Sequence, residues 1–134
     1  MAVVASKRTE SELTLLTNAR ELASYTIKIC SNEKNFPKRY RWCITSKIVD
    51  AAISINSNIL KANSTYVKEK EDYHLRKQYQ VKALVETYEL LCLMDIAYNT
   101  FSIDGNRMKY WVGLVRGVQN ALRKWRKSDE QRFK

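Results

Sequence analysis

The sequence predicts an all-α protein, and three observations carry this prediction. The chain has only three Gly and one Pro in 134 residues, too few turn residues for a sandwich, a barrel or a series of βαβ units. Apolar residues recur at spacings of three and four over long stretches, which is typical of amphipathic helices. The polar links between these stretches are short. We therefore expect one domain over residues 1–134, an antiparallel up-down-up-down four-helix bundle.

The first helix is expected over residues 9–31. Thr9 to Glu12 form a capping-box sequence, in which Thr9 bonds the amide of Glu12 and Glu12 reaches back. The apolar stripe of this helix contains Leu15, Ala19, Leu22 and Ile29, flanked by Leu16, Ala23 and Cys30. A polar break before Pro37 ends it, because Pro37 disfavours helix at the preceding residue.

The second helix is expected over residues 37–62, since proline suits the first turn of a helix. Its β-branched residues keep the helical period for too many turns to be a strand. The core seam contains Ile44, Ile48, Ala52, Ile55 and Ile59. A second apolar row contains Trp42, Val49, Ile53 and Leu60. Such a wide apolar face predicts contact with more than one neighbour.

The third helix is expected over residues 67–99, after the capping residues Asn63 to Thr65. One of its apolar rows contains Ala83, Thr87, Leu90, Met94, Ala97 and Phe101, and the other contains Leu84, Tyr88, Leu91 and Tyr98. Residues 90–94 are apolar all round, which predicts burial from several sides. A single chain would leave part of this apolar surface exposed, so we expect self-association to cover it.

The fourth helix is expected over residues 105–127, with Asp104 as its N-cap. Its heptad seam alternates steps of three and four and contains Met108, Trp111, Val115, Val118, Leu122 and Trp125. At about 100° per residue, the opposite arc spans about 80°. This arc contains no acidic residue and is formed by Lys109, Gly113, Arg116, Asn120, Arg123 and Lys127.

The charge balance points to polyanionic partners. The chain has 24 Lys and Arg against 14 Asp and Glu, a formal net charge of +10. The basic residues gather in three clusters: Lys34, Lys38, Arg39, Arg41 and Lys47; Arg76, Lys77 and Lys82; and Arg116, Arg123, Lys124, Arg126 and Lys127. In an antiparallel bundle the first cluster lies at the opposite end from the second, so one continuous stripe is not required.

Two interpretations of these clusters are open. Charge runs usually form solvated helix faces. The acid-free arc and the basic run around Tyr40 and Trp42 lack the alternating acids of such faces, which favours phosphate binding. The two aromatic rings either stack on bases or pack in the core or an interface.

We expect no enzyme, and therefore no catalytic residue, metal ion or cofactor. The single histidine, His74, lies in a highly charged stretch, and no Glu-x-x-His pair or glycine-rich phosphate loop is present. The three cysteines have no metal or redox spacing and are expected to be small buried apolar residues. No long apolar run or basic leader is present, so a cytoplasmic protein that does not bind membranes is expected.

The chain resembles the accessory variability determinant (Avd) proteins of diversity-generating retroelements. The resemblance covers roughly residues 10–130. It rests on Phe36-Pro37-Lys38 leading through Arg41 into a long helix, on Tyr110-Trp111, and above all on the closing Trp125-Arg126-Lys127. Arg123-Lys124 stands where the family has paired glycine.

The resemblance implies a basic four-helix bundle that assembles as a homopentameric ring. It implies binding to a reverse transcriptase and its template RNA, with DNA or an RNA–DNA hybrid as open alternatives, so that mutagenic cDNA synthesis can proceed. The polymerase carries the chemistry. The basic positions that match are Arg39, Arg41, Arg76, Lys77, Arg116, Arg123 and Arg126.

Two alternatives to this function are carried forward. The four-helix proteins encoded in 23S rRNA intervening sequences have a Ser-Ile-Pro-Ser-Asn-Ile run, which Ser54 to Ile59 resemble without the proline. A protein-interaction scaffold without nucleic-acid binding would use the apolar patches rather than the charges.

Overall fold

Four long α-helices make up most of residues 10–134, the part of the chain that the computed structural model describes, and no strand occurs in that part. The helices are α1 (Glu10–Ser31), α2 (Ser46–Ser64), α3 (Lys70–Thr100) and α4 (Gly105–Arg132). A 3₁₀ turn, η2 (Lys38–Tyr40), and a π-helical turn, η3 (Arg41–Thr45), precede α2. The expected all-helical class is confirmed.

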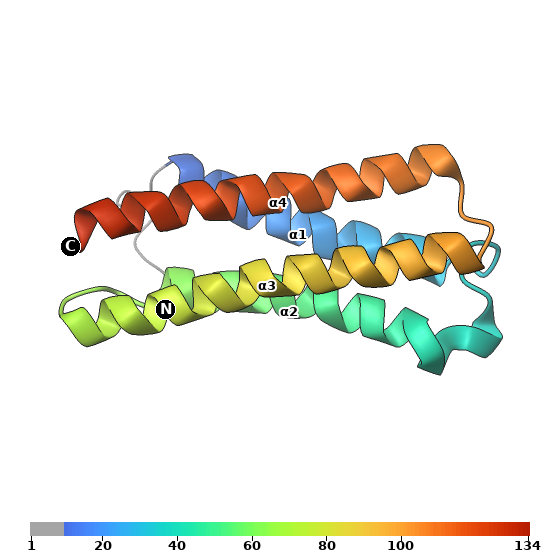
Figure 1. Ribbon diagram of the computed structural model, residues 1–134, viewed down its shortest axis with the longest axis horizontal. Helices are drawn as coiled ribbons and strands as arrows, with labels where there is room; N and C mark the ends of the chain where they lie inside the picture. Colours follow the sequence, from blue (N-terminus) through green and yellow to red (C-terminus); the bar gives the residue numbers. More distant parts are fainter. Residues whose placement is uncertain (1–9) are drawn as a thin grey trace.

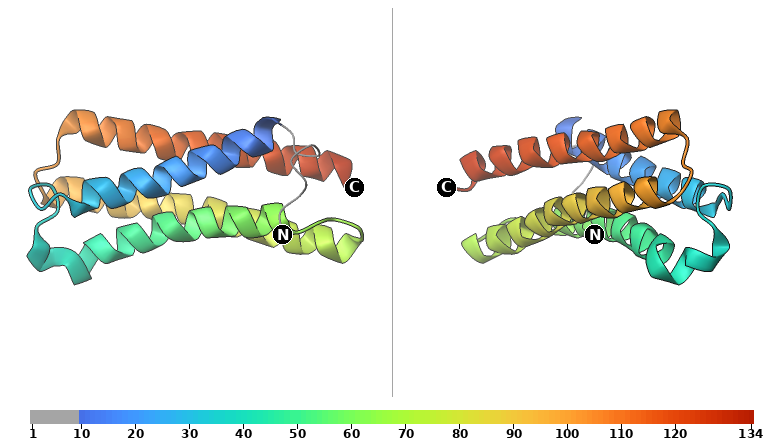
Figure 2. Two further views of the ribbon diagram at one scale, coloured as in Figure 1. Left: turned by 180° about the vertical axis from the view of Figure 1, so that it is seen from behind. Right: turned by 45° about the vertical axis from the view of Figure 1, so that its right-hand side comes forward.

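Each helix packs against two others: α1 against α2 and α4, and α3 against the same two helices. The α1–α2 and α3–α4 connections lie at one end of the molecule (Figure 1). The α2–α3 connection and the C-terminus lie at the other end. From behind, α1 is in front, with α4 on one side and α2 on the other (Figure 2). Basic clusters near the two ends are therefore separated by most of the length of the helices.

The apolar seams form the core largely as the sequence predicts. The buried side chains of α1, α2 and α3 include Leu15, Ala19, Leu22, Ile48, Ala52, Ile55, Ile59, Ala83, Leu90, Met94 and Ala97. On α4 the heptad seam from Trp111 to Trp125 is buried, and Met108 is half-buried. The Trp111 indole nitrogen donates to Thr26 Oγ1 at 2.9 Å, so the largest core ring has its polar atom satisfied.

The second apolar rows of the middle two helices are not core. On α2, Ile53 and Leu60 are exposed and Val49 is half-buried. On α3, Tyr88 and Tyr98 are exposed, and Leu84 and Leu91 are half-buried. The expectation that a single chain leaves apolar surface uncovered is thus met on both helices.

The second helix begins later than predicted. Pro37 starts an irregular segment rather than a first α-helical turn, and regular α-helix begins only at Ser46. The 3₁₀ turn and the π-helical turn shift the register of the residues before α2. Trp42, predicted to continue the second row of that helix, is consequently 80% exposed.

The helix boundaries near residues 65 and 130 also differ from prediction. Thr65 ends α2, where its hydroxyl donates to the Lys61 carbonyl, and does not start α3. The cap of α3 is a reciprocal capping box between Glu69 and Asp72, and the amides of Glu69 and Lys68 lower the pKa of Asp72. Helix α4 runs five residues beyond 127, to Arg132, because its seam continues through the buried Asp129.

The expectation that all three cysteines are buried is only partly correct, and the expected capping role of Thr9 is not tested. Cys30 is buried as predicted, but Cys43 and Cys92 are exposed, because they lie on the outward sides of η3 and α3. Thr9, the first residue of the predicted capping box in α1, lies outside the described residues.

Candidate nucleic-acid interface

The first basic cluster lies on the irregular segment before α2 and on its first turn. Lys38, Arg39, Arg41 and Lys47 are all exposed. Tyr40 is half-buried and packs against Phe101, with ring centroids 5.2 Å apart. The Tyr40 ring therefore belongs to the core edge, whereas the exposed Trp42 indole is free to stack on a flat ligand.

The second and third clusters meet in one groove between α3 and α4. Lys77 from α3 lines this groove with Arg123, Arg126 and Lys127 from α4, and its volume is about 200 Å³. The same lining contains one carboxylate, that of Glu130. Arg126 is half-buried, and its Nε is enclosed without a hydrogen-bond partner in the described part of the chain. We call these four basic residues the α3–α4 groove.

The acid-free arc of α4 faces solvent as predicted. All six of its residues, from Lys109 to Lys127, are exposed, and so is the neighbouring Lys124. Two of its guanidinium groups are positioned by neutral partners. Arg116 donates to Gln119 Oε1 at 3.3 Å, and Arg123 donates to the Tyr88 hydroxyl.

The cations of these surfaces are not neutralised by neighbouring acids. Among residues 12–134, whose side chains the structure describes, the ion pairs within 4.0 Å involve Arg76 alone. No described carboxylate pairs with the cations of the first cluster, of the groove or of the arc. A polyanion that binds here does not first have to displace an internal carboxylate.

Arg76 was predicted to lie on the basic surface, and this prediction is wrong. Its guanidinium is buried and donates two hydrogen bonds to the Asp129 carboxylate, at 2.7 and 2.8 Å. It also approaches Glu12 Oε1 at 3.5 Å and lies over the Trp125 ring, 4.7 Å from the centroid. A guanidinium enclosed in this way holds α1, α3 and α4 together and does not face a ligand.

Sequence reasoning did not find this buried network, although a signal was present. Gln80 Nε2 also donates to Asp129, at 2.8 Å, and Trp125 Nε1 donates to Glu12 at 3.2 Å. Extended by steps of three and four, the seams of α1, α3 and α4 pass through Glu12, Arg76, Gln80 and Asp129. Charged residues at seam positions must be paired when they are buried.

The groove and the arc together form an electropositive face with aromatic residues at its edge. Spaced guanidinium and ammonium groups on helices recognise phosphates, while a lone aromatic ring adds sequence-tolerant stacking. His74, the single histidine, is exposed. Within residues 10–134, no group of three His, Cys, Asp or Glu side chains is placed to hold a metal ion. No helix in this part is long and apolar enough to cross a membrane.

Comparison with protein families, curated proteins and solved structures gives no match.

Proposed function

We propose that this protein is a basic, non-catalytic accessory protein of the Avd type, which binds a reverse transcriptase and its template RNA during mutagenic cDNA synthesis. The observation that carries the proposal is the α3–α4 groove, which four basic side chains from two helices line together with a single carboxylate. Four convergent cations suit the closely spaced phosphates of a nucleic-acid backbone better than one isolated acidic side chain.

The assembled form that we propose is a homopentameric ring of antiparallel up-down-up-down bundles in the cytoplasm. The exposed apolar rows of α2 and α3 support self-association, because they leave large side chains such as Leu60 and Tyr98 in solvent. Each basic surface would then be repeated around the symmetry axis, and binding would gain from avidity.

The first experiment is a titration of a structured RNA at several salt concentrations. Neutralising several phosphates makes the logarithm of the binding constant fall linearly and steeply with the logarithm of the salt concentration. The test variant is Arg116→Glu with Arg123→Glu, because both side chains are exposed on the acid-free arc. We expect RNA affinity to fall at least about tenfold at low salt, and the salt slope to become shallower by about two.

The matched control is Arg20→Glu with Lys28→Glu, which changes the net charge equally on exposed positions of α1. We expect this control to keep most of the RNA affinity. The same pair of variants is then tested for capture of a retroelement reverse transcriptase that is expressed together with this protein. Equal affinities for RNA in both variants would contradict the proposed interface. RNA binding without polymerase capture would contradict the accessory role and favour the intervening-sequence type.

A further inference from the structure

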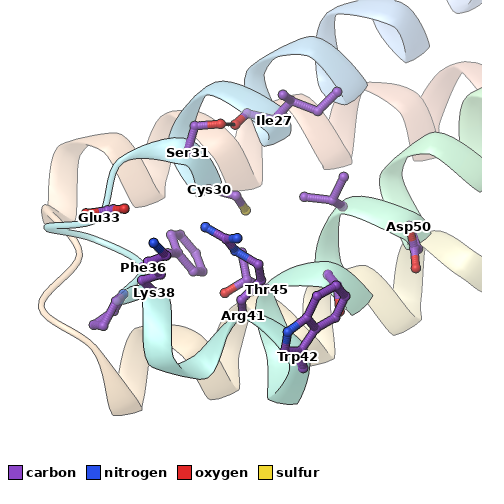
Figure 3. Close-up of a pocket in the computed structure, with 13 residues that line it drawn as sticks. Ile27, Cys30, Ser31, Glu33, Phe36, Lys38, Arg41, Trp42, Thr45 and Asp50 are labelled. Atoms are coloured by element: carbon purple, nitrogen blue, oxygen red, sulfur yellow. Dashed lines mark hydrogen bonds between the residues drawn. The ribbon is translucent and has the colours of Figure 1, made fainter.

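A pocket of about 430 Å³ lies at the end of the molecule remote from the α3–α4 groove. It is formed between the last turn of α1 and the irregular segment that leads into α2 (Figure 3). Its volume is within the range of small-molecule sites, about 300 to 1,000 Å³. Phe36 and Cys30 supply apolar lining. Arg41, Trp42 and Thr45 add a guanidinium, an indole and a hydroxyl group.

The π-helical turn places two unusual side chains at this pocket. Arg41 and Trp42 are adjacent in sequence, both are exposed, and both line it. Figure 3 shows the Arg41 side chain reaching from the turn toward Cys30, with the Trp42 indole beside it. Single π-helical turns occur frequently at functional sites, because they redirect side chains that a regular helix would place elsewhere.

Two polar groups in the pocket have no partner within the described residues. No carboxylate lies within 4.0 Å of the Arg41 guanidinium in residues 10–134. Thr45 is only 9% exposed, and its Oγ1 makes no hydrogen bond to the described residues. An enclosed hydroxyl without a partner is unfavourable by itself, and a molecule in the pocket that Thr45 lines can supply the partner when the side chain turns toward it.

The chemistry of these groups fits a nucleotide. A guanidinium recognises a phosphate through two parallel hydrogen bonds, and Lys38 adds a second cation to the same lining. An exposed indole offers a face on which any base can stack. Glu33 and Asp50 also line the pocket, and their oxygens can accept from ribose hydroxyls or base amino groups.

We propose that this pocket binds a single nucleotide unit, with its phosphate at Arg41 and its base against Trp42. The unit is either a free nucleoside monophosphate or an unpaired nucleotide of an RNA strand. Lys38 and Arg41 belong to the first basic cluster, so this inference deepens the proposed nucleic-acid binding. It can fail separately, because the pocket shares no residue with the α3–α4 groove.

Trp42 also provides the measurement. It is 80% exposed, whereas Trp111 and Trp125 are at most 3% exposed, so quenching by a soluble ligand reports mainly on Trp42. The probes are AMP, adenosine and inorganic phosphate, and calorimetry replaces fluorescence for variants that lack the indole. We expect AMP to bind more tightly than either of its parts. Phosphate that binds as tightly as AMP would contradict the stacking of the base.

Three variants test the three groups. Arg41→Gln should weaken AMP binding about tenfold, because a charged hydrogen bond is lost. Trp42→Leu should weaken it by a similar factor, about tenfold, and Trp42→Phe should restore part of the affinity. Thr45→Val keeps the shape of the side chain and should weaken binding about fivefold. Thermal unfolding of each variant shows whether it keeps the fold.

The matched control is Arg20→Gln, which removes an exposed cation of α1 that does not line the pocket. We expect it to leave AMP affinity unchanged. An equal loss in Arg20→Gln and Arg41→Gln would show a diffuse charge effect and overturn the site.

The source of the nucleotide is distinguished with two RNA hairpins, one fully paired and one with a single unpaired adenosine. If AMP binds the wild-type protein and binds Arg41→Gln and Trp42→Leu more weakly, the ligand is a free nucleotide. If only the hairpin with the unpaired adenosine binds, and both substitutions weaken it, the ligand is a nucleotide of an RNA strand. The proposal fails if neither ligand shows this dependence, or if a tetraglutamate peptide binds at Arg41 and AMP does not. These results leave the proposed RNA binding testable at Arg116 and Arg123.

Discussion

At the scale of single residues, the buried network around Asp129 decides how three helices meet. Its carboxylate accepts hydrogen bonds from both Arg76 and Gln80, and the Arg76 guanidinium lies over the Trp125 ring. Buried ion pairs contribute little net stability compared with well-packed apolar residues. Removing one partner is different, because it leaves the other charge enclosed and unpaired.

We therefore expect Asp129→Ala to lower the free energy of unfolding by about 3 kcal/mol, the low end for a broken buried pair. The low end applies because Glu12 remains 3.5 Å from the guanidinium. Urea denaturation followed by circular dichroism measures the change. Replacement of the exposed neighbour, Glu130→Ala, should change it by less than about 0.5 kcal/mol. The conservative variant Asp129→Asn keeps an acceptor oxygen for Arg76 and Gln80 and should lose less than Asp129→Ala, and an equal loss in the two variants would contradict this account.

A second prediction concerns the three thiols. Burial raises the pKa of Cys30 to about 12, while Cys43 and Cys92 are exposed. Because the thiolate is the reactive form, a thiol reagent at pH 8 should modify Cys43 and Cys92 rapidly and Cys30 only after unfolding. Mass spectrometry of a time course locates the labels. Rapid labelling of Cys30 in the folded protein would show that the end of α1 opens.

The raised pKa also sets a pH dependence of stability. The unfolded thiol releases its proton near pH 9, whereas the folded thiol holds it until about pH 12. The stabilising contribution of the protonated Cys30 is therefore complete below about pH 9 and is lost as the pH rises toward 12. Cys30→Ala should remove this dependence in urea denaturation measured across the same range.

At the scale of elements, the spacing of apolar residues predicted which side chains are buried on the regular helices. It did not predict the exposure of side chains on the irregular turns before α2. The α4 seam and the exposed arc opposite it follow directly from the steps of three and four between Trp111 and Trp125. The position of Trp42 did not follow, because the period of an α-helix cannot be extended through a 3₁₀ turn and a π-helical turn. The pocket at that turn was consequently outside what the sequence predicted.

In the candidate site, too, the sequence pattern predicts part of the arrangement, and the rest depends on how the helices pack. Lys77 and Arg76 are adjacent in a basic cluster, and a charge count cannot tell which of them faces solvent. The apolar seam of α3 does distinguish them. Extended backward from Ala83 by a step of three and then a step of four, it passes through Gln80 and Arg76 and not through Lys77. The meeting of Lys77 with Arg123 depends on how α3 and α4 pack together, which no local pattern encodes.

Gly113 in the middle of α4 gives a prediction for this helix. A Cβ added there meets nothing within 4 Å, and the residue is exposed on the acid-free arc. Gly113→Ala should raise the free energy of unfolding by about 0.5 to 1 kcal/mol, because alanine favours the helix. Gly117→Ala, whose Cβ would lie 3.9 Å from Asn18 Nδ2, serves as the matched variant and should give a similar gain. Thermal unfolding measures both. A destabilising Gly113→Ala would indicate that another chain covers this arc, which would contradict its exposure to RNA.

At the scale of the whole molecule, the basic groups gather at the first cluster and along α3 and α4, and the most exposed aliphatic side chains lie on α2 and α3. Val85 is 60% exposed and Leu60 is 51% exposed. Surface of this kind marks an interaction site, and a second copy of the chain can cover it while the basic faces stay open.

This arrangement predicts that tight RNA binding needs self-association, whereas assembly of the RNA-free protein does not need the RNA-binding side chains. The exposed Val85 and Ile96 form a further apolar row of α3, next to the row that contains Tyr88 and Tyr98. Val85→Glu with Ile96→Glu places charges in this further row and should lower the assembly mass toward the 15.7 kDa of one chain, as measured by light scattering after gel filtration. RNA affinity should fall with it, since avidity across copies is lost while every basic side chain remains. Leu13→Glu changes an exposed apolar residue of α1 and should leave both the mass and the affinity unchanged. The converse variant, Arg116→Glu with Arg123→Glu, should bind RNA poorly yet keep its assembly mass. A wild-type chain that is monomeric at tens of micromolar, or an assembly that survives both α3 substitutions, would contradict the role of this row.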